Sequence, residues 1–431
     1  MIRLGRRLSA GALLFFACFS LAAEENGKLL TGKAAMGDWT GDAPGIRRKI
    51  TVADLPPPND TSSANNGPRV VARPPGAQLH VPAGFQIQEY ASGFRDPRVL
   101  LTAPNGDIFI VESRANQIKV LRERGGKPEA PRIFAESGLN QPFGVAFYPP
   151  GPDPQYLYVA NTDGVIRFPY RNGDLKARGP AEKLGAHLSP GGLLRGGGHW
   201  TRGLAFSPDG IKMYVSIGSQ SNVSDDAAEA DRARIFEFNP DGSGQKVYAW
   251  GIRNAVGIQM RPGTNELWMS TNERDGLGDN LPPDYISHVT SGGFYGWPWF
   301  YIGNHQDPRH KGEKLEWAGK VIVPDVLVQA HSATLNLCFY DGKQFPKEYR
   351  GDIFAAFHGS WNRSRRTGYK IVRVPLDHGK ARGEYEDFVT GFVTPDGNVW
   401  GRPVGLTVAK DGSLLFSEDG HGTIWRVSAS R

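Results

Sequence analysis

The sequence predicts an all-β protein, a six-bladed β-propeller with an extended N-terminal arm. Two observations carry this prediction. The 431-residue chain is rich in turn formers, with 55 glycines and 32 prolines, and it lacks long stretches of helical periodicity. One local pattern, a turn with Gly, Asp or Asn followed by an alternating apolar strand, also returns six times after Phe85. Such a repeat in an all-β chain is typical of a propeller.

The first residues have the pattern of a secretory signal peptide. Arg3, Arg6 and Arg7 precede an apolar run from Ala10 to Ala23 that ends in small residues. This run is shorter than the roughly 20 residues that a membrane span requires. We therefore predict a signal peptide over residues 1–23, a periplasmic or secreted protein, and no integral membrane segment after cleavage. A lipoprotein acylated at Cys18 is a less favoured alternative.

Residues 24–80 are predicted to form the extended arm. The segment is rich in Pro, Asn and Ser, and its apolar residues follow no sustained period. Such an arm either wraps around the following domain or acts as a partly ordered tether. The propeller is predicted over residues 81–431.

The six copies of the turn-and-strand pattern define the blades. They are PNGDIFIVES (104–113), DPQYLYVANTDGVIRF (153–168), SPDGIKMYVSIGS (207–219), GTNELWMSTNERD (263–275), YRGDIFAAFHGSW (349–361) and AKDGSLLFSEDGHGTIWRV (409–427). The interval between the fourth and fifth copies is much longer than the others and must contain an insertion. Two β-sandwiches would not explain why turn and strand recur in the same order throughout.

Charge and cysteine content narrow the possible functions. The formal net charge is +6, half of which comes from the three signal-peptide arginines, and the remaining surplus argues neither for nor against nucleic acid. We predict no nucleic-acid partner. Apart from Cys18, the only cysteine is Cys338, which we interpret as a buried small apolar residue. The sequence has no CxxCH haem motif, no GxGxxG on a βαβ unit, no GxSxG and no phosphate-binding loop.

Candidate site residues lie on loops beside the repeated strands. In a propeller, loops from every blade converge at one end of the central channel, so residues distant in sequence can form one site. His199, in GGGHWTRGLAFSPDG (196–210), is either a general base or a loop histidine bonded to backbone. Arg253 and Asn254 could bind an anionic or carbonyl-bearing ligand, or form an inter-blade salt bridge.

Two further stretches and several cations extend this set. NERDGLGDNLPPDYI (272–286) is an oxygen-rich loop that suits Ca²⁺, or a solvated acidic turn. The aromatic run SGGFYGWPWFYIG (291–303) is either core or a wall that stacks on a flat ligand. His331, Arg363 and Arg402 occupy comparable loop positions. Together these residues favour a flat, polyanionic cofactor with a metal ion and a proton-accepting base beside it.

Several motifs resemble those of the PQQ-dependent glucose/sorbosone dehydrogenase family. They are GGGHWTRGLAFSPDG, GIRNAVGIQ, FYGWP, HSATLNLCFYDG and GRPVGLTVAKDGSLLFSEDG, and they look closest to the L-sorbosone-dehydrogenase-like branch. The resemblance covers nearly the whole mature chain. It implies a six-bladed propeller that holds pyrroloquinoline quinone (PQQ) and Ca²⁺ at the channel mouth. It also implies oxidation of a sugar, sugar aldehyde or alcohol, with electrons leaving to a soluble acceptor or cytochrome.

The resemblance also assigns roles to residues at the mouth. His199 matches the catalytic base, and Arg253 and Asn254 match the pair that contacts the quinone oxygens. The resemblance also makes Arg253 catalytic, because the arginine stabilises charge on the reduced cofactor. The resemblance places Ca²⁺ on the backbone of the Glu273-Arg274-Asp275 turn. The remaining assignments are Arg402, His331 and Arg363 as cofactor-binding residues, and Ser219, Gln220 and Trp200 as substrate-binding residues.

This sequence departs from the family pattern at two informative positions. Val404 stands where the family has a second arginine near the cofactor. Ser219 stands where the glucose enzymes have a sugar-binding aspartate, so glucose specificity is not implied. Two alternative functions remain: a calcium-dependent, lactonase-like hydrolase and a non-catalytic propeller that binds a glycan or a protein. The hydrolase would require carboxylates from several blades, whereas the acidic residues concentrate in one loop.

Overall fold

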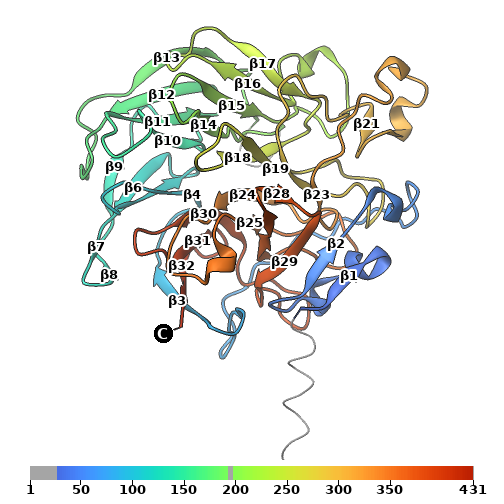
Figure 1. Ribbon diagram of the computed structural model, residues 1–431, viewed down its shortest axis with the longest axis horizontal. Coiled ribbons are helices and arrows are strands. Elements are labelled where there is room, and N and C mark those ends of the chain that lie inside the picture. Colours follow the sequence, from blue (N-terminus) through green and yellow to red (C-terminus); the bar gives the residue numbers. More distant parts are fainter. Residues whose placement is uncertain (1–26, 193–197, 431) are drawn as a thin grey trace, which may run out of the picture.

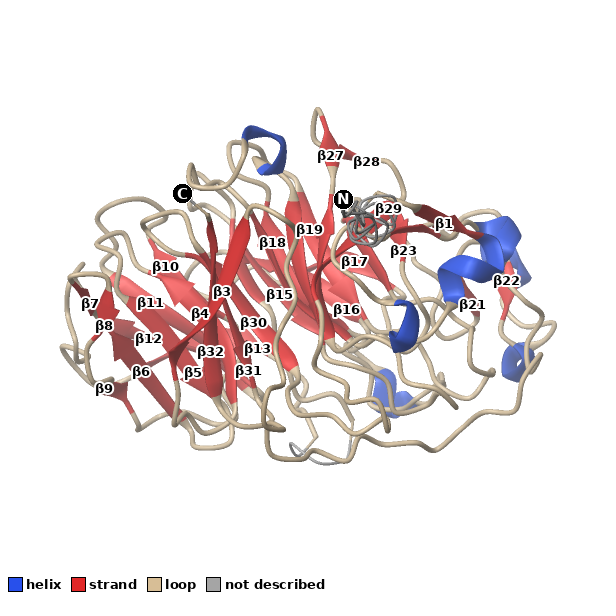
Figure 2. Ribbon diagram, turned by 90° about the horizontal axis from the view of Figure 1, so that it is seen from below, coloured by secondary structure: helices blue, strands red, loops and turns tan. Residues whose placement is uncertain are grey.

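The computed structural model describes residues 27–192 and 198–430. The predicted signal peptide lies outside these residues, and so do Gly196 and Gly197 of the glycine run. Within the described ranges, six antiparallel sheets surround a central channel and form the predicted six-bladed β-propeller (Figure 1). Figure 2 shows the strands running through the body of the molecule, with the connecting loops gathered at its two faces.

Each blade has four strands, and the first strand of each lines the channel. In the first three blades the strands are β4 (Pro97–Thr102), β5 (Ile108–Glu112), β6 (Gln117–Leu121) and β9 (Arg132–Ala135), then β10 (Val145–Tyr148), β11 (Tyr156–Asn161), β12 (Gly164–Pro169) and β13 (Glu182–His187), then β14 (Leu204–Phe206), β15 (Met213–Ile217), β16 (Arg234–Phe238) and β17 (Lys246–Trp250). In the last three they are β18 (Ala255–Met260), β19 (Leu267–Thr271), β20 (Tyr285–His288) and β23 (Val326–Leu327), then β24 (Thr334–Phe339), β25 (Ile353–Phe357), β26 (Lys370–Val374) and β29 (Glu384–Val389), then β30 (Pro403–Val408), β31 (Leu414–Glu418), β32 (Thr423–Ala429) and β3 (Phe85–Ala91).

Small elements complete the described part of the chain. They are β1 (Leu29–Thr31), β2 (Arg47–Lys49), the hairpins β7 (Glu123–Arg124) with β8 (Lys127–Pro128), β21 (Phe300–Tyr301) with β22 (His305–Gln306) and β27 (Leu376–Asp377) with β28 (Lys380–Ala381), and the 3₁₀ helices η1 (Gly32–Met36), η2 (Trp39–Gly41), η3 (Val52–Asp54), η4 (Ala227–Glu229), η5 (Pro308–His310), η6 (Leu315–Trp317) and η7 (Lys347–Tyr349). None of the helices in residues 27–192 and 198–430 has the length and apolar character needed to cross a membrane.

The strand recognised in the sequence repeat is the second strand of every blade. β5, β15, β19, β25 and β31 are buried along their whole length, because neighbouring blades cover both faces of each sheet. The predicted insertion lies in the fourth blade, between β20 and β23. It carries β21, β22, η5 and η6, and it projects at the periphery of the ring (Figure 1).

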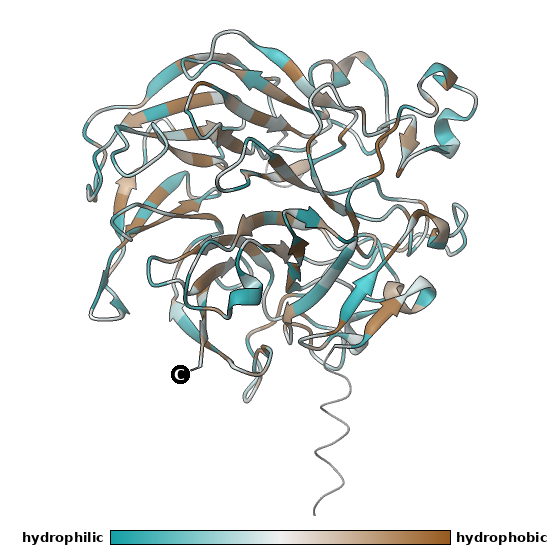
Figure 3. Ribbon diagram, viewed as in Figure 1, coloured by the Kyte–Doolittle hydropathy of each residue, from teal (hydrophilic) through white to brown (hydrophobic). Residues whose placement is uncertain are grey.

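Apolar clusters between adjacent blades form the core. Figure 3 shows apolar residues concentrated along the strands. Phe109 of the first blade and Phe168 of the second belong to one such cluster. Cys338 is buried as predicted, and burial raises the pKa of its thiol. The aromatic run 291–303 is mainly core, since Phe294 is buried and stacks on Trp250 with ring centroids 4.1 Å apart.

The ring closes by pairing the two ends of the propeller. β3 pairs antiparallel with β32, with Phe85 opposite Ala429, so the sixth blade takes three strands from the end of the chain and one from before the first blade. This closure was not predicted from the sequence, because it depends on hydrogen bonds between segments more than 300 residues apart.

The arm is fastened to the fifth blade by strand pairing and by buried charges. β2 pairs with β29, and β1 adds a further strand outside β2. The buried Arg48 guanidinium lies 2.7 Å from Asp387 and 2.9 Å from Asp42. Lys370 lies 2.8 Å from both carboxylates, so two cations and two anions alternate in this network.

Replacing Arg48 by alanine should lower the free energy of unfolding by about 3–5 kcal/mol, because it leaves two buried carboxylates with one cation. Arg47 is the matched control, since its side chain is 40% exposed and lies 3.5 Å from Glu384. The Arg47→Ala variant should lose at most about 1 kcal/mol. Urea denaturation measures both values, and equal losses in the two variants would contradict the proposed importance of the buried network.

Candidate active site

Five of the predicted site residues lie on loops that lead into the first strands of the blades. His199 precedes β14, Arg253 and Asn254 precede β18, His331 precedes β24, and Arg402 precedes β30. All four strands start at the same end of the channel, so the topology brings these loops together at one mouth. The channel itself is lined mainly by apolar residues of the first strands, which places the polar chemistry at the mouth.

The imidazole of His199 is held by Ser219. Its Nδ1 lies 2.8 Å from the Ser219 carbonyl oxygen and 3.1 Å from Ser219 Oγ. Because a carbonyl can only accept, Nδ1 carries the proton and Nε2 presents a lone pair. Burial and the nearby Arg253 cation lower the pKa of His199 to about 3. The side chain is therefore a neutral imidazole at physiological pH, and its Nε2 accepts no hydrogen bond from the described residues.

Two buried arginines and a glycine set the position of His199. Arg202 and Arg232 donate to the His199 carbonyl over 3.0 and 2.8 Å, and both side chains are buried. A Cβ on Gly218 would lie 2.7 Å from His199 Cβ and 2.3 Å from Asn254 Oδ1. Glycine at position 218 therefore allows the histidine and the asparagine to lie side by side. Neither arginine was predicted from the sequence as a site residue.

The three predicted substrate residues lie around the histidine. Ser219 is fully buried, and its hydroxyl donates to the Ser221 carbonyl over 2.6 Å. We therefore propose that Ser219 positions His199 and does not contact substrate. Trp200 packs edge-to-face on Phe143 at 5.8 Å. The Gln220 backbone N–H donates to Glu229 Oε2 over 2.8 Å, which fixes the loop after β15.

Arg253 is clamped by the loops on either side of it. Its Nε and Nη2 donate to the backbone and side-chain oxygens of Asn222, each over 3.0 Å, and its Nη1 donates to the Glu273 carbonyl over 2.7 Å. Asn222, which also donates to the Asp275 carbonyl over 2.9 Å, was not predicted. The neighbouring Asn254 Oδ1 is buried and has no hydrogen-bond partner in residues 27–192 and 198–430.

The predicted metal turn is rich in buried oxygens. Burial raises the pKa of Glu273 to about 7 and that of Asp284 to about 6. The Asp275 carbonyl accepts from Arg274 Nε over 3.0 Å, and the Arg274 guanidinium pairs with Asp307 at 2.6 Å. Arg274 could therefore serve a cation only through its backbone, whereas Glu273 and Asp284 offer buried carboxyl groups.

His331 and Arg363 are already engaged by the protein. His331 has a positive φ of 64°, its Nε2 lies 2.9 Å from the Gly278 carbonyl, and its Nδ1 lies 3.5 Å from Asp275 Oδ1. Arg363 donates to Asn280 over 2.9 Å and to the carbonyl of Met36 in the arm. The cofactor contacts of these two residues stay a prediction. We interpret both as braces of the acidic loop and the arm.

Arg402 lies between a histidine and a cavity. Its Nη2 donates to His358 Nδ1 over 2.9 Å, and His358 Nε2 donates to Asp419 over 2.9 Å. Burial and Arg402 lower the pKa of His358 to about 4. Beside this chain is a cavity of about 480 Å³ lined by Val70, Arg95, Asp96, Arg114, Arg402, Asp419 and Gly420. Its three arginines suit an anionic group.

Val404, at the position of the second family arginine, has a structural role here. It is fully buried and packs with Phe143, Val256 and Leu335 across the channel. A buried apolar cluster below the mouth therefore takes the place of the arginine that the family has at this position.

A neutral histidine makes stability depend on pH. Between pH 6.5 and 3 the unfolded chain takes up a proton at residue 199 that the native protein does not, so the free energy of unfolding should decrease as pH falls through this window. The His199→Gln variant lacks this titration and should lose part of the decrease. Urea denaturation at pH 7 and pH 4.5 measures both proteins, and an identical pH dependence would contradict the neutral imidazole.

Comparison with known proteins gives a family match over most of the chain. A model of the TrAA12-like family matches residues 79–284 and 304–430. A protein of uncharacterized function from Borreliella burgdorferi is 30% identical over 360 residues, which cover 81% of this chain and 90% of that protein.

Two fungal proteins extend the comparison. The pyrroloquinoline quinone-dependent pyranose dehydrogenase of Coprinopsis cinerea is 22% identical, and the match covers 82% of this chain but only 55% of that enzyme. The holo form of its PQQ domain superimposes with a TM-score of 0.68 at 20% identity, covering 83% of this chain and 98% of the domain. A calcium structure of a Trichoderma reesei enzyme of carbohydrate-active family AA12 gives a TM-score of 0.69 at 20% identity, covering 85% and 99%.

Proposed function

This chain belongs to the TrAA12-like family, and on that basis we propose that it is a PQQ-dependent dehydrogenase that oxidises a sugar. The observation that carries the proposal is the His199 imidazole, which is neutral, fixed in one tautomer and next to a clamped arginine. A base of this kind can remove the proton of a substrate hydroxyl. Nothing comparable is needed in a propeller that only binds a glycan.

The residues at the mouth fit the cofactor that the family implies. PQQ is flat and carries several carboxylates. Arg402 and the arginine-lined cavity beside it suit those carboxylates, and Arg253 suits a quinone oxygen. The buried Asn254 amide, whose oxygen lacks a described partner, is available to a bound group. We assign PQQ to this mouth.

A calcium ion fits the acidic loop. Ca²⁺ prefers carboxylate and backbone carbonyl oxygens. The Glu273-Arg274-Asp275 turn supplies carbonyls, and Glu273 and Asp284 add carboxyl groups whose pKa values are raised by burial. The carboxyl groups come from one blade, which distinguishes this loop from the multi-blade carboxylate set expected of a lactonase-like hydrolase.

The protein's own groups perform the proton transfer. The substrate hydroxyl donates a hydrogen bond to His199 Nε2, and its proton passes to that atom as the C–H bond breaks and the carbonyl forms. When bound, PQQ supplies the acceptor for the hydride that leaves carbon. Ser219 keeps the Nδ1 proton in place throughout, and Arg253 stabilises negative charge that develops nearby. A bound anion also raises the pKa of His199, which improves it as a base.

The finer assignments rest on the sequence. We propose a sugar aldehyde of the sorbosone type as one substrate class, because the motifs look closest to the L-sorbosone-dehydrogenase-like branch. The signal-peptide pattern supports a periplasmic or secreted location. Electrons would leave to a soluble acceptor or a cytochrome.

Reconstitution tests the proposal directly. The protein is purified without cofactor, PQQ and Ca²⁺ are added, and the absorbance of bound quinone is followed during a panel of sugars and sugar aldehydes with a dye acceptor. Stoichiometric binding and bleaching by a substrate support the dehydrogenase. Failure of PQQ to bind at micromolar concentration with Ca²⁺ present refutes it, and turnover of a lactone panel would then favour the hydrolase.

Removing the base should abolish turnover. His199→Gln should lower kcat by about 10²–10⁴-fold while PQQ still binds, because the variant loses proton acceptance at Nε2. His187→Gln is the matched control, since His187 is exposed on β13, and it should retain full activity. Dye reduction measures both, and unchanged turnover in His199→Gln would exclude His199 as the base.

Removing the Arg402 cation beside the cavity should weaken the binding of PQQ. Arg402→Ala should raise the Kd for PQQ by about 10- to 100-fold, the effect of one lost charge-assisted hydrogen bond. Arg365, which is 61% exposed, provides the control variant Arg365→Ala with unchanged affinity. Quenching of tryptophan fluorescence by PQQ measures both constants. If Arg402→Ala and Arg365→Ala bind PQQ with equal affinity, the PQQ carboxylates do not bind at Arg402.

A further inference from the structure

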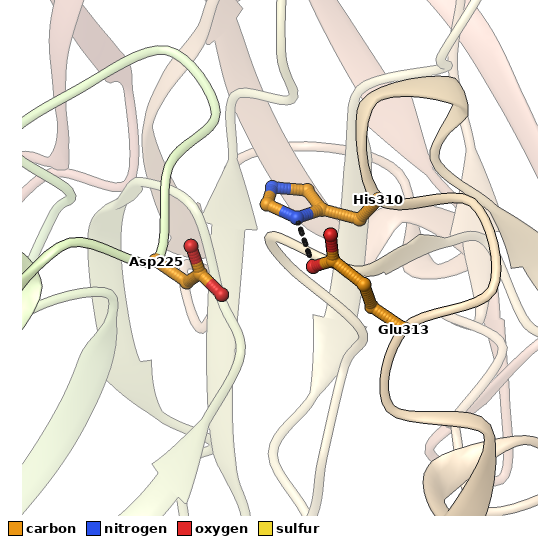
Figure 4. Close-up of side chains that lie close together, drawn as sticks. All are labelled: Asp225, His310 and Glu313. Atoms are coloured by element: carbon orange, nitrogen blue, oxygen red, sulfur yellow. Dashed lines mark hydrogen bonds and ion pairs between the residues drawn. The ribbon is translucent and has the colours of Figure 1, made fainter.

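A second cluster of metal-ligating side chains lies away from the mouth. Asp225 is on the loop after β15, and His310 and Glu313 are in the insertion of the fourth blade. One ligand atom from each residue lies within 4.8 Å of the other two. Figure 4 shows the His310 ring reaching from the insertion toward the Asp225 loop, with Glu313 beside it.

His310 has one ring nitrogen bonded and one without a partner. The side chain is buried, and its Nδ1 lies 2.8 Å from Glu313 Oε2. An ionised carboxylate only accepts, so Nδ1 donates and Nε2 presents a lone pair. This Nε2 is buried and has no hydrogen-bond partner among the residues that the structure describes. A buried acceptor without a donor is uncommon and requires an explanation.

This arrangement is the one that metal-binding histidines use. A carboxylate that accepts from one ring nitrogen fixes the tautomer and directs the other nitrogen at the metal. The neighbouring carboxylates leave room for coordination, since Asp225 is exposed and the Glu313 side chain is 51% exposed. Asp225 also accepts from Trp299 Nε1 over 3.2 Å, which holds its carboxylate on this side of the loop.

We propose that Asp225, His310 and Glu313 bind a divalent transition-metal ion such as Zn²⁺. An imidazole with a carboxylate suits zinc, whereas calcium prefers an all-oxygen set. The metal ligands are His310 Nε2 and the Asp225 carboxylate, and Glu313 orients the imidazole through Nδ1. This site differs from the calcium site assigned to the Glu273 turn in both residues and chemistry.

The ion would connect the insertion to the active-site scaffold. Asp225 lies three residues after Asn222, whose backbone and side-chain oxygens hold Arg253. A metal bridge from Asp225 to the insertion would therefore stiffen the loop that fixes the catalytic arginine. The bridge joins the third blade to the fourth at the outside of the ring.

Calorimetric titration of the full protein with Zn²⁺, in excess Ca²⁺, tests the site without reference to turnover. The wild type should bind one Zn²⁺ at micromolar or lower Kd, and Zn²⁺ should raise its Tm. His310→Gln and Asp225→Asn should each weaken binding at least tenfold and remove the Tm shift. Asp226→Asn is the matched control, because Asp226 accepts from Ser224 and is outside the cluster. It should bind as the wild type does.

Three results would overturn the proposal. They are the absence of Zn²⁺ binding at micromolar concentration, binding that persists in both cluster variants, and displacement of Zn²⁺ by Ca²⁺ at equal concentration. If His310→Gln fails to fold, Asp225→Asn decides the outcome, since Asp225 is exposed and its replacement removes no core contact.

Discussion

The pairing of β3 with β32 is the constraint on which the rest of the structure depends. A propeller positions its mouth by fixing every blade relative to its neighbours, and this pairing closes the ring between the two ends of the domain. The candidate site draws on four blades, from His199 in the loop before the third to Arg402 in the loop before the sixth. A ring open at the sixth blade would let these loops separate.

Within the closed ring, buried arginines hold the irregular loops in place by donating hydrogen bonds to the backbone carbonyl groups of those loops. Arg202 and Arg232 bind the carbonyl of His199, Arg253 binds that of Glu273, and Arg366 binds those of Asn66 and Gly397. Loop carbonyls have no strand neighbour to satisfy them, and a guanidinium offers five donors in a fixed plane. Most of these arginines therefore hold the loops in place. Arg402 differs, because it borders a cavity and could bind a ligand there.

Much of this fold follows from local patterns in the sequence, and the site follows only in part. The six turn-and-strand copies predict the second strands because alternation and turn residues are local signals. The position of His199 at the mouth follows from its place before a repeated strand. The engagement of Arg363 and His331 did not follow, because their partners are Met36 in the arm and Gly278 in another loop. Such long-range hydrogen bonds leave no periodic trace in the sequence.

The arm has a consequence for the order of assembly. Its binding partners are β29 and the loops around Gly278 and Arg363, which are synthesised long after the arm itself. The arm therefore stays unpaired until the fifth blade has been synthesised. Thr61 and Ser63 of the arm then bind the acidic loop, because their hydroxyl groups accept hydrogen bonds from the backbone N–H groups of Asp279 and Gly278. Because the arm can dock only after the fifth blade has formed, an ion can enter this loop before the arm covers it.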